Sequence, residues 1–226
     1  MRKPSDLGFD DSKHILPELI ERQTVVNNKN PLSINGQTQM FNFPAQNFAE
    51  IKAEVRSTIH ERCEMAVSKA NDHEISVYWV NLNDEADLIS QIDKSTVEVK
   101  GKMDIDEKEE ILLSFSKGEI KKLITKTSIT AFGLNWQHCN HTVFFPTWSY
   151  EQYYQAIRRF WRFGQQNQVT CDMVISEGQE RVMEALEQKT QKAIELYENL
   201  VQAANKTFTH STKEFDKTIQ LPEFLK

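Results

Sequence analysis

A buried β-strand is predicted by the run Ile75-Ser76-Val77-Tyr78-Trp79-Val80, which is rich in β-branched and aromatic residues. Charged periodic stretches and further apolar runs follow it in alternation. We expect helices at residues 84–92, 106–116 and 150–163, and strands at 96–99, 122–125, 141–145 and 169–175. Strands and helices in alternation are typical of an α/β fold, in which helices cover both faces of a parallel sheet. The sequence therefore predicts such a sheet over residues 75–175.

Long helices are expected on both sides of this region, because apolar residues recur there every three or four positions. One helix is expected over about 44–71 and another over about 178–204. Residues 1–43 are expected to be irregular apart from one strand that ends at Val26. The chain is therefore divided into an irregular extension (1–43), a lobe with a leading helix (44–176), and a long C-terminal helix with a tail (177–226).

The composition excludes several classes of protein. Lys plus Arg number 27 and Asp plus Glu number 33, so the formal net charge of −6 excludes a uniformly basic nucleic-acid coat but allows a local basic groove. No apolar run approaches the ~20 residues that span a bilayer, and the start lacks a secretory signal. We expect a soluble cytoplasmic protein without a membrane partner. No glycine-rich phosphate loop of the P-loop or dinucleotide-binding kind occurs.

Three arginines are concentrated in the segment Gln155-Ala156-Ile157-Arg158-Arg159-Phe160-Trp161-Arg162-Phe163-Gly164-Gln165. On an ideal helix, Gln155, Arg159 and Arg162 fall within about 60° of one another. We expect Arg159 and Arg162 to be at least partly exposed, and we expect the opposite side to be buried, namely Tyr153, Ile157 and Trp161. Guanidinium groups stay charged and bind phosphate oxygens in a fixed geometry. This face therefore suits a phosphate group, and a solvated basic helix face is the alternative.

This segment resembles motif six of the superfamily-two helicases, in the Swi/Snf-like form found in chromatin remodellers and in phage and bacterial helicases. The run Thr127-Ser128-Ile129-Thr130-Ala131-Phe132-Gly133-Leu134-Asn135-Trp136 resembles motif five, and strand 77–80 followed by Asn81 is similar to the motif-four strand. The motifs have the order and spacing of that family, and the resemblance covers about residues 75–175. Three residues depart from the family pattern: Ser128, Thr130 and Arg158.

The resemblance implies a RecA-like fold and the second, C-terminal lobe of an ATP-dependent helicase or DNA translocase of the DEAD/DEAH type. It implies that ATP and Mg²⁺ are bound mainly by an N-terminal RecA-like lobe of the same enzyme, which is an expected partner together with DNA rather than RNA. We expect the chain alone to hydrolyse no ATP, and to be either a piece of a longer protein or a separately encoded lobe. The alternative is a non-catalytic helicase-like lobe that acts as a protein-interaction module through its C-terminal helix.

The resemblance also implies roles for individual residues. The implied catalytic residues are the arginine fingers Arg159 and Arg162. The implied ATP contacts are Gln155, Gly133, Asn135 and Gln165. The implied nucleic-acid contacts are Thr127, Ser128, Lys126, Lys100 and Asn81.

Other motifs have simpler interpretations than catalysis. Asp84-Glu85-Ala86-Asp87 spells an acidic Mg²⁺ box, but we interpret it as the first turn of a helix with Asn83 or Asp84 as N-cap. His138-Cys139-Asn140-His141 is interpreted as a loop before a buried strand, and no metal site is expected. Four aromatic residues are expected in the core rather than in a base-stacking platform: Trp148, Tyr150, Tyr153 and Tyr154. Five lysines near strand ends either track phosphates or lie on a solvated surface: Lys100, Lys102, Lys121, Lys122 and Lys126.

Overall fold

The computed structural model describes residues 16–28, 33–34, 37–38, 48–129, 134–147 and 149–210. Residues His14–Lys189 form one compact unit. The second unit is described through the part of α6 that follows Lys189. Among the described residues, no helix has the length and apolar character needed to cross a membrane.

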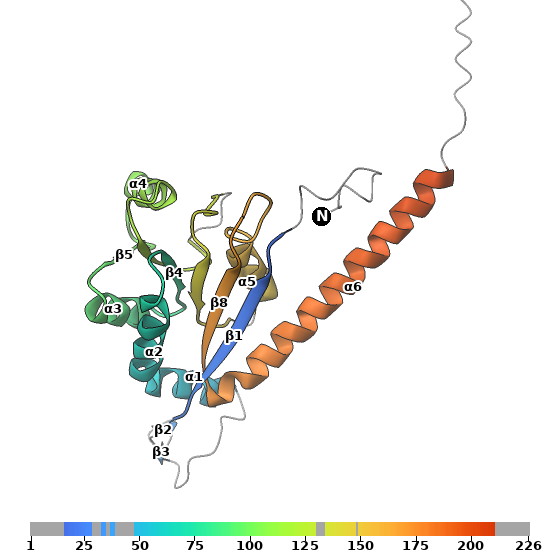
Figure 1. Cartoon of the computed structure of the whole chain (residues 1–226). Coiled ribbons are helices and arrows are strands. Elements are labelled where there is room, and N and C mark those ends of the chain that lie inside the picture. The colour runs from blue at the N-terminus through green and yellow to red at the C-terminus, as the bar shows by residue number, and fades with distance from the viewer. Residues whose placement is uncertain are drawn as a thin grey trace, which may run out of the picture. The chain divides into compact units, whose positions relative to one another are not determined.

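A sheet of six parallel strands forms the centre of the first unit, in the order β1-β8-β7-β4-β6-β5 (Figure 1). The strands are β1 (Leu19–Val26), β4 (Ser76–Trp79), β5 (Thr96–Glu98), β6 (Lys122–Thr125), β7 (His141–Phe144) and β8 (Val169–Ser176). A separate antiparallel pair is formed by β2 (Ser33–Ile34) and β3 (Gln37–Thr38). The predicted parallel sheet is confirmed.

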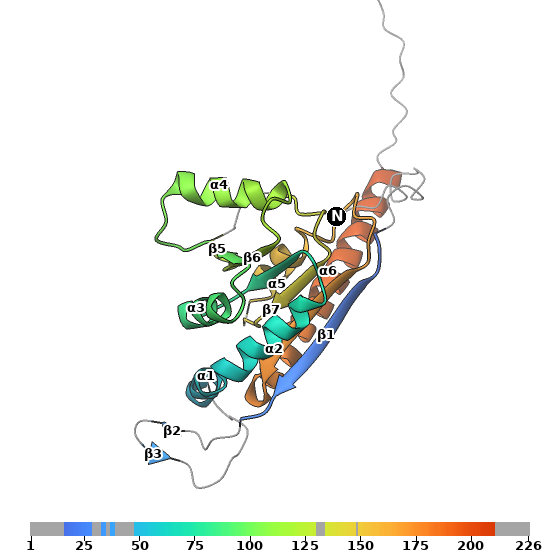
Figure 2. The same cartoon turned by 60° about the vertical axis from the view of Figure 1, so that its left-hand side comes forward.

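Helices cover both faces of this sheet. The helices of this unit are α1 (Phe48–Ser57), α2 (Ile59–Asn71), α3 (Asn83–Ile92), α4 (Ile105–Ser116) and α5 (Tyr150–Ile157). A short 3₁₀ turn, η2 (Glu177–Gln179), precedes the long helix α6 (Glu180–His210). Successive strand residues point to opposite faces, so Val77 and Trp79 pack with α5, whereas Tyr78 and Val80 pack with α2 and α3. Figure 2 shows α2 and α5 on opposite sides of the strands. The RecA-like α/β fold class is therefore confirmed.

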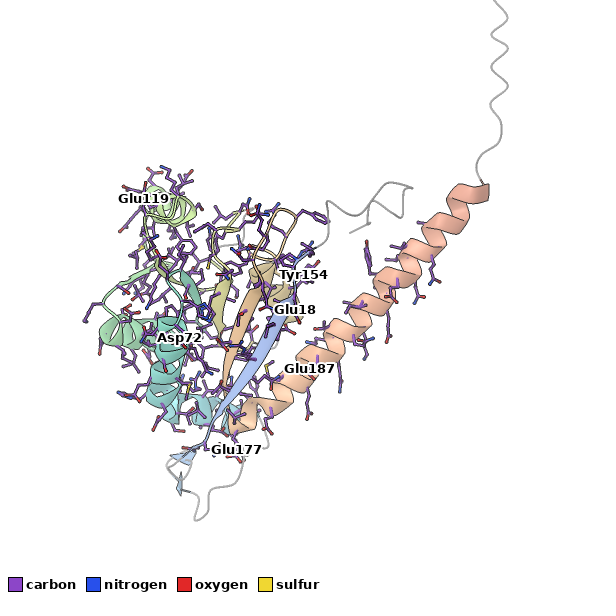
Figure 3. All side chains as sticks on the ribbon, viewed as in Figure 1. Glu18, Asp72, Glu119, Tyr154, Glu177 and Glu187 are labelled. Atoms are coloured by element: carbon purple, nitrogen blue, oxygen red, sulfur yellow. The ribbon has the colours of Figure 1, made fainter. Side chains whose placement is uncertain are left out.

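The segment expected to be an irregular extension contributes β1 to the sheet. Eight residues of β1 pair with β8, from Leu19 beside Val169 to Val26 beside Ser176. Gln23 of β1 also donates to Glu187 of α6 over 3.4 Å, and Figure 3 labels Glu187. β1 therefore belongs to the sheet although it lies before the expected boundary at residue 43. The β-branched end of β1 predicts a strand, but the pairing with β8 spans far too much sequence for local pattern to reveal it.

Two expected helices also differ from the structure. The helix over 44–71 is divided at Thr58, whose Oγ1 donates to the carbonyl of Glu54 over 2.8 Å; such back-bonding by threonine bends helices. The helix over 150–163 ends at Ile157. Beyond it the chain turns, Phe160 enters the core, and Gly164 has a φ of +98°. Gly118 has a φ of +78° after α4, the left-handed conformation that glycine commonly adopts just past the end of a helix.

Candidate functional site

Parallel strands place their carboxyl ends at one edge of the sheet, which is where ligands bind in open α/β folds. Figure 3 labels Glu18, which precedes β1, and Glu177, which follows β8 at the carboxyl edge. We call residues 80–82, 126–129 and 145–147 the carboxyl-edge loops, because they follow β4, β6 and β7. Most of the predicted nucleic-acid contacts lie in these loops: Asn81, Lys126, Thr127 and Ser128.

Side-chain hydrogen bonds join the carboxyl-edge loops to one another. Asn81 donates from Nδ2 to the carbonyls of Phe145 and Pro146, each over 3.0 Å. Lys126 donates from Nζ to Oδ1 of Asn83 over 2.7 Å. The loops that follow β4, β6 and β7 therefore form one connected surface.

Motif five also contacts the helix that precedes motif six. Thr127 donates from Oγ1 to Oε1 of Gln152 in α5 over 3.3 Å, whereas the neighbouring Ser128 is exposed. The segment that resembles motif five is therefore fixed at Thr127 and presents Ser128 to solvent.

The other predicted lysines are neutralised by carboxylates or lie away from these loops. Lys100 follows β5 and contacts Asp87 and Glu98, each over 3.2 Å. Hydrogen bonds to Glu98 and then to Asp87 raise the pKa of Lys100. Lys121 and Lys122 lie at the opposite, amino end of β6, where they pair with carboxylates. Of the two readings left open for the five lysines, the position of Lys121 and Lys122 at the amino end favours a solvated surface for these two.

Arg159 is buried, with a side-chain environment that the sequence did not predict. Because α5 ends at Ile157, Arg159 lies in the following turn and is only 6% exposed. Its guanidinium carbon lies 6.0 Å from the ring centre of Trp79 and 5.4 Å from that of Trp136, and its carbonyl accepts from the Trp136 amide over 3.0 Å. Cation–π contacts of this kind compensate in part for lost hydration. Burial lowers the pKa of Arg159 to about 10, so the side chain stays charged at neutral pH.

Arg162, by contrast, is exposed. Its carbonyl accepts from the amide of Gln165 over 3.0 Å and from Nε2 of Gln137 over 3.4 Å, so the backbone is fixed while the side chain is presented to solvent. Gln155 is also exposed and donates to Glu151 within α5 over 3.0 Å. The predicted common helical face of Gln155, Arg159 and Arg162 does not exist, since only Gln155 lies in the helix.

The predicted burial of the opposite face is correct in part. Tyr153 and Ile157 are buried, whereas Trp161 is half-buried and donates from Nε1 to the carbonyl of Pro17 over 2.6 Å. Tyr154 is exposed, contrary to its expected core position, and is labelled in Figure 3. Trp148 and the side chain of Tyr150 lie outside the described residues.

Two segments that lead into β7 and β8, residues 134–140 and 158–165, are bonded to each other, and we call them the loop pair. Gln165 is buried and donates from Nε2 to the carbonyls of Gln137, Cys139 and Phe160 over 3.0–3.3 Å. A contact between Gln165 and ATP would require these bonds to break. Gly164 lies close to the side chain of Gln137: a Cβ added at Gly164 would lie only 2.9 Å from Nε2 of Gln137. A larger residue at position 164 would therefore displace the Gln137 side chain. Asn135 is exposed and donates to Gln137 over 3.1 Å, and Gly133 lies outside the described residues.

The acidic box forms the first turn of α3, as predicted, but its N-cap is Leu82 rather than Asn83 or Asp84. Glu85 accepts from the amides of Asn81 and Leu82, each over 2.9 Å. Its other oxygen pairs with Arg62, which the sequence analysis did not single out. The available signal was a charged residue four positions before Ala66, at the edge of the apolar stripe of α2.

His141, from the cluster interpreted as a loop before a strand, is buried as the first residue of β7. Its Nδ1 lies 2.9 Å from Oγ of Ser76, its Nε2 lies 3.0 Å from Oδ2 of Asp172, and the ring of His73 stacks on it at 3.7 Å. Within the described residues, no group of three or more His, Cys, Asp or Glu side chains is arranged to bind a metal ion.

Comparison with known proteins finds a similar family for part of the chain. Residues 57–164 match the family model of the helicase conserved C-terminal domain. This segment contains β4 to β7, the carboxyl-edge loops and nearly all of the loop pair. This part of the chain is therefore similar to helicase C-terminal domains.

Solved structures with similar folds include the C-terminal domain of the DEAD-box protein Dbp5, with a TM-score of 0.50 and 17% identity over 57% of this chain and 78% of that chain. A variant of Dbp5 from S. cerevisiae bound to Gle1 and IP6 matches with a TM-score of 0.52 and 18% identity, and the match covers 58% of this chain and 37% of that chain. The C-terminal part of the Fun30 ATPase domain matches with a TM-score of 0.49 and 14% identity, and the match covers 59% of this chain and 47% of that chain. No curated protein matches the chain.

Proposed function

We propose that this chain acts as the second, C-terminal lobe of a two-lobe, ATP-dependent helicase or DNA translocase of the Swi/Snf-like type found in phage and bacteria. The observation that carries the proposal is the position of Arg162. This arginine is exposed at the end of a segment that matches the helicase C-terminal domain, and its backbone is fixed by the loop pair. An exposed guanidinium on a rigid backbone suits a phosphate that arrives from another lobe.

In this proposal the two motif-six arginines have different roles. Arg162 contacts the γ-phosphate of ATP and stabilises the charge that develops during hydrolysis. Arg159 lies over the indoles of Trp79 and Trp136 and positions the segment that carries Arg162. The N-terminal lobe binds Mg²⁺ and the remaining phosphates. Gln155 and Asn135 are exposed near these segments and remain proposed ATP contacts.

The carboxyl-edge loops are the proposed contact with a nucleic-acid backbone. Ser128 is exposed, and Lys126, Thr127 and Asn81 are half-buried in the same connected surface. The chain has a formal net charge of −6, so the attraction is confined to this surface. Binding by this lobe is therefore weak and falls with rising salt, as counterion release requires.

A protein-interaction module is the second candidate function. The observation that favours it is the exposure of large apolar side chains on α6: Ile194, Leu196 and Leu200. Such a module would bind its partner whether or not ATP is present.

ATP hydrolysis tests the proposed function. The chain alone should hydrolyse no ATP, whereas the chain combined with an N-terminal RecA-like lobe that carries a phosphate loop should show DNA-stimulated hydrolysis. Binding of labelled single- and double-stranded DNA by the chain alone, at low and moderate salt, provides the second measurement. Hydrolysis by the chain alone contradicts the proposal, as does a folded two-lobe protein that hydrolyses no ATP and binds no DNA.

A further inference from the structure

A buried ion pair lies beneath the carboxyl-edge loops. Nη2 of Arg62 in α2 is 2.9 Å from Oε1 of Glu85 in α3, and the two side chains are 0% and 1% exposed. Buried ion pairs contribute little net stability, because taking both charges out of water costs about as much as their attraction returns. In some proteins such pairs instead specify one geometry. The bonds around this pair indicate which geometry it specifies here.

Glu85 connects the ion pair to the loop that follows β4. While Oε1 contacts Arg62, Oε2 accepts from the backbone amides of Asn81 and Leu82, each over 2.9 Å. Those amides directly precede α3, so no carbonyl of the helix accepts from them. The carboxylate therefore fixes the backbone from which the Asn81 side chain reaches the carbonyls of Phe145 and Pro146.

Arg62 connects the same pair to the bend between α1 and α2. Its Nη2 also donates to the carbonyl of Val55 over 2.6 Å, and its Nε donates to Oγ1 of Thr58 over 3.2 Å. Its guanidinium carbon lies 5.0 Å from the ring centre of Phe145, the first residue after β7. Arg62 therefore contacts the helix bend and the loop after β7, in addition to Glu85.

The bend is itself bonded to the end of a third strand. Oε1 of Glu54 in α1 accepts over 2.7 Å from the amide of Gly178, which lies in the turn η2 that follows β8. The carbonyl of Glu54 accepts from Thr58, which in turn accepts from Arg62. Continuous hydrogen bonds and one cation–π contact, buried or partly buried, thus connect the segments that follow β4, β7 and β8.

We infer that Arg62 and Glu85 are positioning residues for nucleic-acid binding by the carboxyl-edge loops, an inference that rests on the proposed function. The pair sets the backbone at Asn81 and Leu82. Asn83, the next residue, accepts from Lys126, which directly precedes the segment that resembles motif five. A shift of this loop therefore displaces two of the proposed contacts at once, although neither Arg62 nor Glu85 touches the nucleic acid.

The test removes both charges together, in the full chain. Arg62→Met with Glu85→Leu replaces the pair by apolar side chains of similar size, a change that is often neutral for stability. We expect a melting temperature close to that of the wild type, amide exchange at Asn81 and Leu82 faster by about tenfold or more, and affinity for a labelled DNA oligonucleotide about tenfold weaker. Each tenfold change in affinity corresponds to about 1.4 kcal/mol.

Lys122→Met with Asp93→Leu is the matched control, because this mostly buried pair has an N–O distance of 2.8 Å but lies at the amino end of β6. It should leave both affinity and the exchange of the Asn81 amide unchanged. Should the first double variant not fold, Glu85→Gln serves instead: it keeps an acceptor oxygen and should weaken binding about threefold, with faster exchange at Asn81 and Leu82.

Unchanged exchange at these amides in a folded variant overturns the inference, and so does wild-type affinity despite faster exchange. If the wild-type chain binds no DNA even at low salt, the proposed nucleic-acid contact of the carboxyl-edge loops fails. The exchange measurement then decides by itself whether the ion pair positions the loop.

Discussion

The carboxyl-edge loops and the loop pair both carry residues predicted from helicase motifs, but they are stabilised by different contacts. At the carboxyl-edge loops, side chains from separate elements bond to loop backbone: Glu85 to amides, and Asn81 to carbonyls. In the loop pair the Gln165 side chain also donates to carbonyls, but here Trp136 bonds backbone to backbone with Arg159 as well, and two indoles contact the Arg159 guanidinium. A network of polar side chains adjusts to a ligand more readily than a segment packed in aromatic core. We infer that the loop pair is the rigid region and the carboxyl-edge loops the adaptable one.

Strand β4 connects the two regions. Trp79, its last residue, contacts Arg159 through its ring, and Asn81 follows two residues later in the loop after β4. A change in the position of Asn81 therefore acts on the same stretch of backbone that carries Trp79, the residue against which Arg159 packs. This continuity gives a physical route by which nucleic-acid contact affects ATP hydrolysis in the proposed enzyme.

The largest expected effect belongs to Arg162→Ala in the two-lobe enzyme. It should lower kcat by about 10³-fold or more, since an arginine that stabilises transferring phosphate contributes about 10³–10⁵ in rate. The melting temperature should stay unchanged, because the side chain is exposed. Steady-state ATPase assays and thermal melts of the same preparation check both statements. Near-normal kcat would remove Arg162 from the proposed catalytic role.

Arg159→Ala should lower the stability of the fold instead. The two variants therefore distinguish the packing role of Arg159 in the loop pair from the catalytic role proposed for Arg162. Deleting a buried side chain between Trp79 and Trp136 leaves a cavity and removes two cation–π contacts. We expect a loss of about 3 kcal/mol in the free energy of unfolding, measured by urea denaturation. Arg158→Ala is the control, since its half-buried side chain lies over Tyr154 and Trp161 near the surface, and should cost less than about 1 kcal/mol. Equal losses would show that Arg159 has no special packing role.

The sequence predicts the fold far better than it predicts the environment of single side chains. The alternation of strands and helices follows from local periodicity, and the strands predicted at 122–125 and 169–175 match β6 and β8 to within one residue. The partner of β1 could not be predicted, because pairing across most of the chain leaves no local pattern. The bend at Thr58 could not be predicted either, because it depends on a single hydrogen bond from the Thr58 hydroxyl to the carbonyl of Glu54.

The candidate site shows where motif spacing misleads. The helical spacing of Gln155, Arg159 and Arg162 predicts a common face only if the helix continues, and α5 ends before the first arginine. Arg159 therefore turns toward Trp79 and Trp136, which are distant in sequence. Arg62 was missed because a charge on an apolar stripe has meaning only once its partner, Glu85, is known.

Acidification tests the buried cluster around His141, which lies within the sheet and away from the carboxyl-edge loops and the loop pair. Burial lowers the pKa of His141 to about 4; the bond to Asp172 opposes this shift, and His73 and Arg22 add to it. The unfolded chain therefore takes up a proton on this ring below about pH 6.5, whereas the folded chain does so only near pH 4. Stability from this group is complete above pH 6.5 and is lost as the pH falls toward 4, by about 2–3 kcal/mol.

Urea denaturation between pH 7 and pH 4 measures this loss. His141→Asn should flatten the profile, whereas the control His60→Asn, at an exposed histidine paired with Glu64, should leave it unchanged. If the His141→Asn variant loses as much unfolding free energy between pH 7 and pH 4 as the wild type does, other groups cause the loss.

The smallest expected effect distinguishes two lysines of the predicted nucleic-acid surface. Lys126 lies in the carboxyl-edge loops, among the proposed nucleic-acid contacts, where its Nζ donates to the amide oxygen of Asn83. Lys100 lies between the carboxylates of Asp87 and Glu98, which neutralise it locally. Lys126→Gln should therefore weaken DNA binding by the chain about threefold to tenfold at low salt and reduce the slope of log affinity against log salt by about one counterion. Lys100→Gln should change affinity by less than about twofold, because exposed charges already paired with carboxylates contribute little. Fluorescence anisotropy titrations at two salt concentrations measure both variants, and an equal loss in the two would place Lys100 within the binding surface and contradict the neutralisation argued from its carboxylates.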